Sequence, residues 1–387
     1  MSDYKDNRAV SEDFISDLKN SKKLAVFTDF VRNLNNELQM CFRGNDSQEK
    51  VIVYKNNHKV WEIVKYTGQH KYKVGISFKH ARYCDDLETI LEKFVELGFR
   101  RKTLSQIIDN GYLYTDYQTS FSEEFVTKTY SLIRQLFDSY FNYEHRTNGI
   151  HKEKDWLKTK NNKEIDSDVE VLYTDKKFLV EKIKQQELFY NVFNDIQGCF
   201  AYDLEFSQKY PSKYYKKQNN VNSNQPDMLA IKANEDKVDM VFIEVKSLKS
   251  ACTGDSGVIK HLRGKVNYID EIIVESKDKK YKVLENRKTE ACEIIKAYKE
   301  LGLRACDKEI TVDDFDRVEI MLVFTDTGVD SVYKYDIKAN MEKDISAVEW
   351  INDIRNKNSV KKEIKNYQNV KFSFKTYIDG QLNDVVL

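Results

Sequence analysis

Two acids and a lysine have the residue types and the spacing of a phosphodiester-cleaving site. Asp227 begins one apolar segment, and Glu244 and Lys246 end the next one, residues 241–246. Side chains alternate along a strand, so Glu244 and Lys246 are expected on the same face. Phosphodiester hydrolysis needs charge neutralisation and an activated water, which Mg²⁺ supplies when one or two carboxylates hold it. The three residues therefore predict a catalytic site with Mg²⁺ (or Mn²⁺).

The two acidic positions are predicted to meet across a β-hairpin. The polar stretch from Asn234 to Lys237 is suited to a tight turn between two apolar strands. If pairing is symmetric about that turn, Leu229 faces Phe242 and Asp227 faces Glu244. Directly opposed residues have Cβ atoms about 5 Å apart, and like charges there destabilise a hairpin unless a cation or a proton intervenes.

An isolated Glu-x-Lys triplet is common in a chain with 33% charged residues and more often merely ends a strand. The joint pattern is more specific. Pro226-Asp227, followed seventeen residues after Asp227 by Glu244-Val245-Lys246, resembles the PD-(D/E)xK nuclease superfamily over residues of about 176 to 330. The resemblance implies a restriction-endonuclease-like core of order αβββαβ, and Mg²⁺-dependent cleavage of nucleic acid, with DNA the expected substrate.

The resemblance also implies roles for individual residues. Asp227 and Glu244 would bind the metal, and Lys246 would be the catalytic lysine, with an electrostatic role beside the reacting phosphate. The family carries a further acid in the helix before the first strand, where Glu187 is the match. Glu205, on the first strand, competes with Glu187 for this role, and either could instead be a surface acid.

Two segments carry residue types that bind nucleic acid. Lysines contact phosphates and tyrosines stack on bases, and the expected loop 207–225 is rich in both. A second segment, residues 256–265, begins the next helix, whose N-terminus can bind an anion. The alternatives are a solvated loop and, for the histidine, a solvated surface position. The candidates are Lys209, Lys213, Tyr214, Lys216, Lys217, Lys260, His261 and Arg263, with Lys265 also possible.

Hydrophobic periodicity predicts an α+β N-terminal domain, an antiparallel meander plus helices, over residues 1–145. Its helices are expected at 11–37, 87–99 and 121–141, and its strands at 38–42, 51–54, 60–64 and 72–78. We assign it a role in substrate or effector recognition, or in dimerisation, by analogy alone.

A polar linker is expected at residues 146–170, followed by an α/β nuclease-like domain with a mixed sheet at 171–345 and a C-terminal extension at 346–387. The nuclease-like domain should contain a helix at 178–196, a strand at 199–206, a hairpin at 227–246, an interrupted helical region at 258–301 and a strand at 318–324.

Composition narrows the class of protein. The 63 basic and 63 acidic residues cancel, so a nucleic-acid site must be a local patch. No apolar run is long enough to span a membrane and the start of the chain lacks a signal-peptide pattern, so we expect a cytoplasmic protein. A homodimer is expected if double strands are cut. The alternatives are a nucleic-acid-binding or regulatory protein with a silent nuclease-like fold, and a protein-interaction scaffold.

Overall fold

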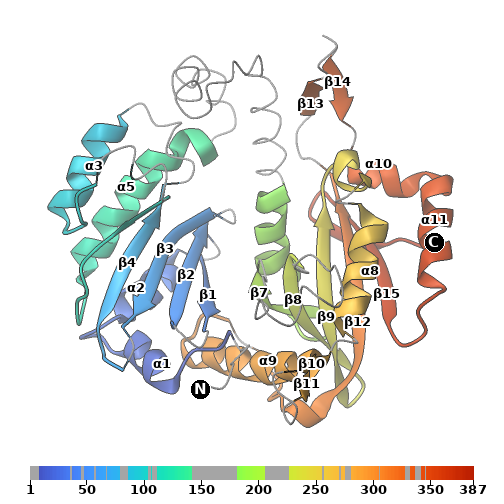
Figure 1. Cartoon of the computed structure of the whole chain (residues 1–387), viewed down its shortest axis with the longest axis horizontal. Helices are drawn as coiled ribbons and strands as arrows, with labels where there is room; N and C mark the ends of the chain where they lie inside the picture. The colour runs from blue at the N-terminus through green and yellow to red at the C-terminus, as the bar shows by residue number, and fades with distance from the viewer. Residues whose placement is uncertain are drawn as a thin grey trace. The chain divides into compact units, whose positions relative to one another are not determined.

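The computed structural model describes most of the chain in two compact units (Figure 1). The N-terminal unit is Ala9–Lys176 with Leu301–Leu303, and the C-terminal unit is Met1–Arg8, Lys177–Glu300 and Arg304–Leu387. The expected linker, 146–170, lies outside the described residues. Those residues are 8–34, 37–44, 48–55, 58–66, 68–78, 86–102, 106, 111–141, 181–204, 226–254, 257–269, 272–274, 280–304, 306–326, 332–335, 341–344 and 346–387.

The N-terminal unit contains the antiparallel meander that the sequence predicts. Its strands pair in chain order, each antiparallel to the next. The fifth strand was not predicted, because three residues are too few to show a period. The strands are β1 Gln39–Arg43, β2 Lys50–Lys55, β3 His58–Lys65, β4 Tyr72–Ser77 and β5 Tyr112–Tyr114.

The helices of this unit cover one face of the meander. The single helix expected at 11–37 is wrong, because Asn20 adopts an extended conformation and divides it into α1, Glu12–Lys19, and α2, Ala25–Asn33. Helices α3, Leu87–Glu96, and α5, Glu123–Phe141, lie within the predicted ranges. Trp61 of β3 is fully buried against Phe27 and Phe30 of α2 and Tyr130 of α5.

The C-terminal unit is built on a mixed seven-stranded sheet, in the order β16-β15-β12-β9-β8-β7-β6. Strands β9, β12 and β15 are parallel, and the other neighbours are antiparallel. The strands are β6 Asn194–Asp195, β7 Cys199–Leu204, β8 Met228–Asn234, β9 Lys237–Lys246, β12 Phe315–Thr325, β15 Lys371–Ile378 and β16 Gln381–Asp384.

Residues 346–387 belong to this unit and contribute two strands to its sheet, although the sequence indicated a separate extension. Strand β15 pairs with β12 in parallel from Glu319 opposite Lys371 to Thr325 opposite Tyr377. The two helices that precede β15 are α10, Ala347–Asn352, and α11, Ile354–Ile364. The short strands β13, Val332–Tyr335, and β14, Met341–Asp344, form a separate hairpin.

The remaining helices differ in length from the predicted ones. Residues 181–187 are α-helical and continue into a π-helical turn, η3 Leu188–Val192, so the helix expected at 178–196 ends early. The region 258–301 contains α8, Val258–Ile269, and α9, Val283–Glu300, with a small hairpin of β10, Ile272–Val274, and β11, Lys280–Lys282, between them. Short 3₁₀ turns occur at η4, Lys249–Ala251, and η6, Val312–Asp314.

Arg304 attaches the 181–192 helix to the sheet. Its guanidinium donates to the carbonyls of Phe189 (3.0 Å), Phe193 (2.6 Å) and Ala201 of β7. It also lies 4.2 Å from the ring centroid of Phe189 and 4.5 Å from that of Phe200. These contacts set the position of the acids on this helix.

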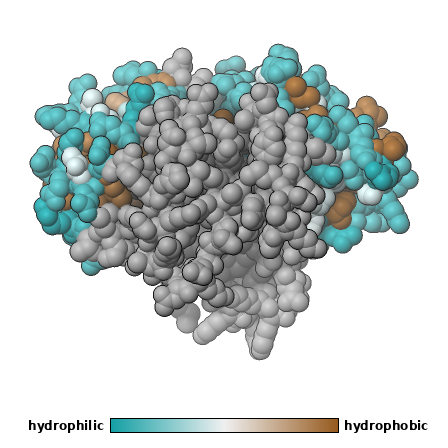
Figure 2. All heavy atoms as spheres, turned by 90° about the horizontal axis from the view of Figure 1, so that it is seen from above, coloured by the Kyte–Doolittle hydropathy of each residue, from teal (hydrophilic) through white to brown (hydrophobic). Residues whose placement is uncertain are grey.

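The described surface is mainly hydrophilic on the face drawn in Figure 2, with small separate hydrophobic areas. Among the helices that the structure describes, we find none with the length and apolarity that a membrane crossing requires.

Candidate functional site

The hairpin formed by β8 and β9 has the predicted register. Leu229 lies opposite Phe242 in the ladder, and Met228 lies opposite Ile243. The turn is shorter than predicted, because Asn234 and Lys237 still pair and only two residues connect the strands. The midpoint of the turn is the same as in the predicted hairpin, so the two strands pair in the predicted register.

Asp227 lies just before β8 and reaches across to β9. Its Oδ2 accepts a hydrogen bond of 2.7 Å from the backbone N–H of Val245. The carboxylate thus accepts a hydrogen bond of the kind that a backbone carbonyl accepts elsewhere between the two strands of the hairpin. It lies close enough to Glu244 for the charge of Glu244 to raise the pKa of Asp227.

Glu244 is buried and surrounded by nitrogen donors. Lys246, two residues along the same face of β9, donates to its Oε1 at 2.7 Å. Helix α8 supplies His261, whose Nδ1 contacts the same oxygen, and Lys265, whose Nζ donates to Oε2 at 2.5 Å. One further turn along α8, Tyr268 meets the ring of Phe242 edge-on at 5.8 Å. The side chains at positions i, i+4 and i+7 of α8 therefore lie on one helical face, which packs along β9.

The ionisation of the two acids is unequal. Burial, then the charges of Glu244 and Glu181, raise the pKa of Asp227 well above its ordinary value. Burial also acts to raise the pKa of Glu244, but the adjacent Lys246 and Lys265 outweigh it and hold this pKa well below the usual range. Burial acts to lower the pKa of Lys246, whereas Glu244, Glu181 and Asp227 raise it, with a net increase. Lys246 is therefore a charged ammonium.

A third acid, Glu181, acts on the site through its charge, where the sequence offered Glu187 or Glu205. Glu181 raises the pKa of both Asp227 and Lys246 through its charge, so it lies near both. Glu187 is directed elsewhere: its Oε1 accepts a 2.6 Å hydrogen bond from the hydroxyl of Tyr377 on β15. The competing candidate, Glu205, lies outside the described residues.

The predicted nucleic-acid contacts separate into three groups. Lys260 is exposed on α8, and His261 is half-buried against Glu244 with 29% of its side chain exposed. Arg263 does not face the site, because its guanidinium makes two 2.7 Å hydrogen bonds to the carboxylate of Glu363 on α11. The loop candidates lie outside the described residues: Lys209, Lys213, Tyr214, Lys216 and Lys217.

Sequence reasoning missed Glu181 and gave no specific place to Lys265. Glu181 and Glu187 are six residues apart, which places them about 120° apart around a helix, so only one of them can face the site. Lys265 lies four residues after His261, on the same helical face. That spacing was visible in the sequence and would have grouped the two.

The side chains of the site can be assessed as ligands of a divalent cation. Within the described ranges, no cluster of three or more His, Cys, Asp or Glu side chains is arranged as a metal site. Mg²⁺ needs only one or two protein carboxylates. Asp227 fits this need, because a bound cation would offset the repulsion from Glu244 and Glu181 that raises its pKa. Glu244 is the poorer ligand, since both of its oxygens already contact cationic side chains.

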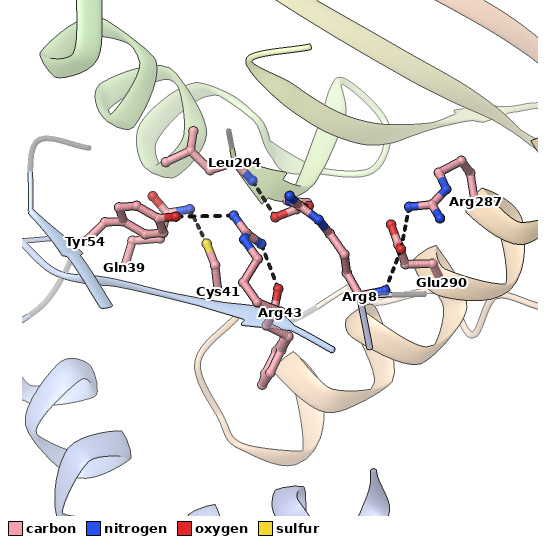
Figure 3. A network of polar contacts seen from close by, with 10 residues as sticks. Arg8, Gln39, Cys41, Arg43, Tyr54, Leu204, Arg287 and Glu290 are labelled. Atoms are coloured by element: carbon pink, nitrogen blue, oxygen red, sulfur yellow. Dashed lines mark hydrogen bonds and ion pairs between the residues drawn. The ribbon is translucent and has the colours of Figure 1, made fainter. Parts of the chain in front are cut away.

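A second buried charged cluster lies in the same unit (Figure 3). Glu290 of α9 accepts hydrogen bonds at Oε2 from Arg287 Nη1 (2.5 Å) and from the backbone N–H of Arg8 (2.7 Å). The guanidinium of Arg8 donates to Asp203 of β7 at 2.6 Å. We call Arg8, Asp203, Arg287 and Glu290 the arginine cluster.

Comparison with protein-family models, with curated proteins and with solved structures finds no match to this chain in any of the three.

Proposed function

We propose that the C-terminal unit is a metal-dependent nuclease of the PD-(D/E)xK type that hydrolyses phosphodiester bonds, with DNA as the expected substrate and restriction, phage defence or repair as the expected context. One observation carries the proposal. Asp227 and Glu244 meet beside two buried lysines at the end of the β8–β9 hairpin, and the charge of a third acid, Glu181, acts on both Asp227 and Lys246.

The residues have different roles in this proposal. Asp227 and Glu181 would hold Mg²⁺ or Mn²⁺, which when bound polarises the phosphate and activates water. Lys246 acts as a fixed positive charge beside the phosphate, since its raised pKa keeps it protonated. The raised pKa favours this electrostatic role of Lys246 over a general-base role.

Glu244 and Lys265 act by holding Lys246 in place. Lys265 anchors one oxygen of Glu244, which leaves the other oxygen to orient the ammonium of Lys246. A side chain held on both sides loses little conformational freedom when substrate binds. His261 is the most exposed of these groups and is placed to contact a phosphate or a water at the open side of the site.

The element order also supports the proposal. A helix, 181–192, precedes β7; β8 and β9 form a hairpin; α8 follows; and β12 returns parallel to β9. This order is similar to the αβββαβ core of the superfamily, and it places Pro226-Asp227 and Glu244-Val245-Lys246 at neighbouring strand ends.

The test is cleavage of plasmid DNA, linear DNA, single strands and RNA with Mg²⁺ or Mn²⁺. We expect the wild type to cleave at least one substrate, and Asp227→Asn and Lys246→Met each to lose about a hundredfold or more in rate, because each removes a charge needed in the transition state. Asp384→Asn is the matched control, since it makes the same change in an exposed ion pair with Lys375.

Metal-dependent cleavage that persists at the wild-type rate in Asp227→Asn, in a preparation free of contaminating nuclease, would contradict the proposal.

A second candidate is a nucleic-acid-binding or regulatory protein in which this site does not turn over. The engagement of both Glu244 oxygens by lysines favours it. Calorimetric titration with Mn²⁺ separates the two: binding that is lost in Asp227→Asn supports the nuclease, and no binding by the wild type supports the silent site.

A further inference from the structure

The meander of the N-terminal unit has one face covered by helices. Its other face carries buried apolar side chains at β1 and β2, such as Cys41 and Ile52, and polar and aromatic side chains toward β4 and β5. Paired residues share a face, so Glu62, Gly75 and Tyr114 form one row across β3, β4 and β5. Trp61, next to Glu62 in β3, points to the helices. The row therefore lies on the opposite face.

Tyr114 lies directly over the backbone of β4. A Cβ atom at Gly75 would be only 2.2 Å from Cε1 of the Tyr114 ring, so a glycine is required at this position. The hydroxyl of Tyr114 extends across the strand and donates to Glu62 at 2.7 Å. The ring is thus held in place at both its edge and its hydroxyl.

Other tyrosines gather around this ring. Tyr112 is nearly parallel to Tyr114, with centroids 5.8 Å apart and planes 17° apart. The ammonium of Lys73 is 4.5 Å from the centroid of Tyr114 and 5.3 Å from that of Tyr117. Tyr66, 44% exposed, meets Tyr117 edge-on at 4.9 Å. We call Tyr66, Lys73, Tyr112, Tyr114 and Tyr117 the tyrosine surface.

The charges at the tyrosine surface favour an anionic partner. Glu62 and Asp116 are compensated by Lys50 and by Arg100, respectively. Lys73 makes no ion pair with any carboxylate in the part of the chain that the structure describes, and its ammonium lies against rings instead. Lys102 adds a second positive charge, donating to the carbonyl of Tyr112 at 3.1 Å. The chain has zero net charge, but among these described side chains the basic ones outnumber the acidic ones.

We infer that the tyrosine surface binds single-stranded nucleic acid, with unpaired bases stacking on the tyrosine rings and the phosphates contacting Lys73. Aromatic rings beside lysines suit a single strand, because every base has a stacking face and the backbone carries regular charge. Bases in a duplex are already stacked on one another and cannot use the rings. The inference deepens the proposed function, since it names the form of substrate that the N-terminal unit recruits.

The test is fluorescence anisotropy of the full-length chain with labelled oligothymidine, oligouridine and a duplex, in EDTA so that cleavage is suppressed. Tyr66→Ala and Tyr117→Ala should each weaken single-strand binding by about fivefold or more through lost stacking. Tyr66→Phe and Tyr117→Phe keep the rings and should bind like the wild type. Lys73→Ala should reduce the dependence of log Kd on log salt by about one phosphate contact.

The outcomes distinguish this inference from the proposed function. Unchanged affinity in both alanine variants, or tighter binding of the duplex than of single strands, overturns the inference even if the wild type cleaves DNA. Ring-dependent binding by a protein that cleaves nothing supports the inference and overturns the nuclease. No binding of any oligonucleotide by the wild type also overturns the inference and indicates a protein partner. The DNA and RNA probes identify the sugar preferred.

Discussion

The C-terminal unit buries two charged clusters that differ in their access to solvent. The candidate site combines Glu244 with Lys246 and Lys265, and the partly exposed side chain of His261 connects it to solvent. In the arginine cluster, the side chains of Arg287 and Glu290 are 0% exposed. Both clusters contain an acid whose pKa burial raises, Asp227 in one and Glu290 in the other.

The difference shows which features indicate chemistry. A raised pKa occurs in both clusters, so by itself it does not support a catalytic role for either. The site is distinguished by lysines rather than arginines, by a third acid, Glu181, and by an exposed edge at His261. The arginine cluster instead connects Arg8, near the start of the chain, to β7 and α9, as a structural contact would.

The largest effect is expected from breaking the arginine cluster. Arg287→Leu leaves Glu290 buried without its side-chain partner, and removing one member of a buried pair costs about 3–5 kcal/mol. Thermal unfolding followed by circular dichroism should show a clearly lower Tm. The double variant Arg287→Leu/Glu290→Leu should recover most of the loss, because neither charge is then buried alone.

The variant Lys265→Met makes the corresponding change in the candidate site. It should lower the Tm less than Arg287→Leu, because Glu244 keeps Lys246 and His261 as partners, yet it should reduce cleavage. A larger Tm loss for Lys265→Met than for Arg287→Leu would reverse the assignment of structural and functional clusters.

A smaller effect is expected in the pH dependence of stability. Burial raises the pKa of Glu290 to about 7 from 4.5, despite the opposing charge of Arg287. Between these values the folded chain holds a proton that the unfolded chain has lost, so the free energy of unfolding falls as pH rises through this window. The shift corresponds to about 3 kcal/mol, fully lost above pH 7.

Glu290→Gln provides the measurement, because it removes this titration and leaves the others. The difference in unfolding free energy between wild type and variant should therefore change between about pH 4.5 and pH 7 in the direction given above. A difference that does not vary with pH would show that Glu290 titrates normally.

The smallest effect is expected for metal binding, in a comparison of two acids on the same helix, Glu181 and Glu187. Glu181→Gln should weaken Mn²⁺ binding about tenfold, as loss of a supporting carboxylate does at metal sites. Glu187→Gln should leave it unchanged, since Glu187 bonds to Tyr377. Calorimetric titration of both variants checks this, and equal effects would restore Glu187 as the predicted ligand.

These two acids also show how far sequence reasoning extends. The helix was predicted, but which of its sides faces the site depends on Arg304 and Tyr377, which are more than 100 residues away in the chain. The spacing of His261 and Lys265 groups them on one face of α8, but the sequence does not show that this face meets Glu244, because a helical face is chosen by the strand that it packs against. The sequence also separated β15 as an extension, since nothing in its pattern indicates that it pairs with β12.

The sequence by itself determined the local geometry: the alternation that places Glu244 beside Lys246, and the hairpin register set by a polar turn between two apolar strands. Such features depend on residues that are near in the chain. The tertiary structure alone decided that Lys265 anchors Glu244, that Glu187 bonds to Tyr377 while the charge of Glu181 acts on Asp227, and that β15 joins the sheet. These outcomes depend on packing between distant segments, where burial makes each charge require a partner.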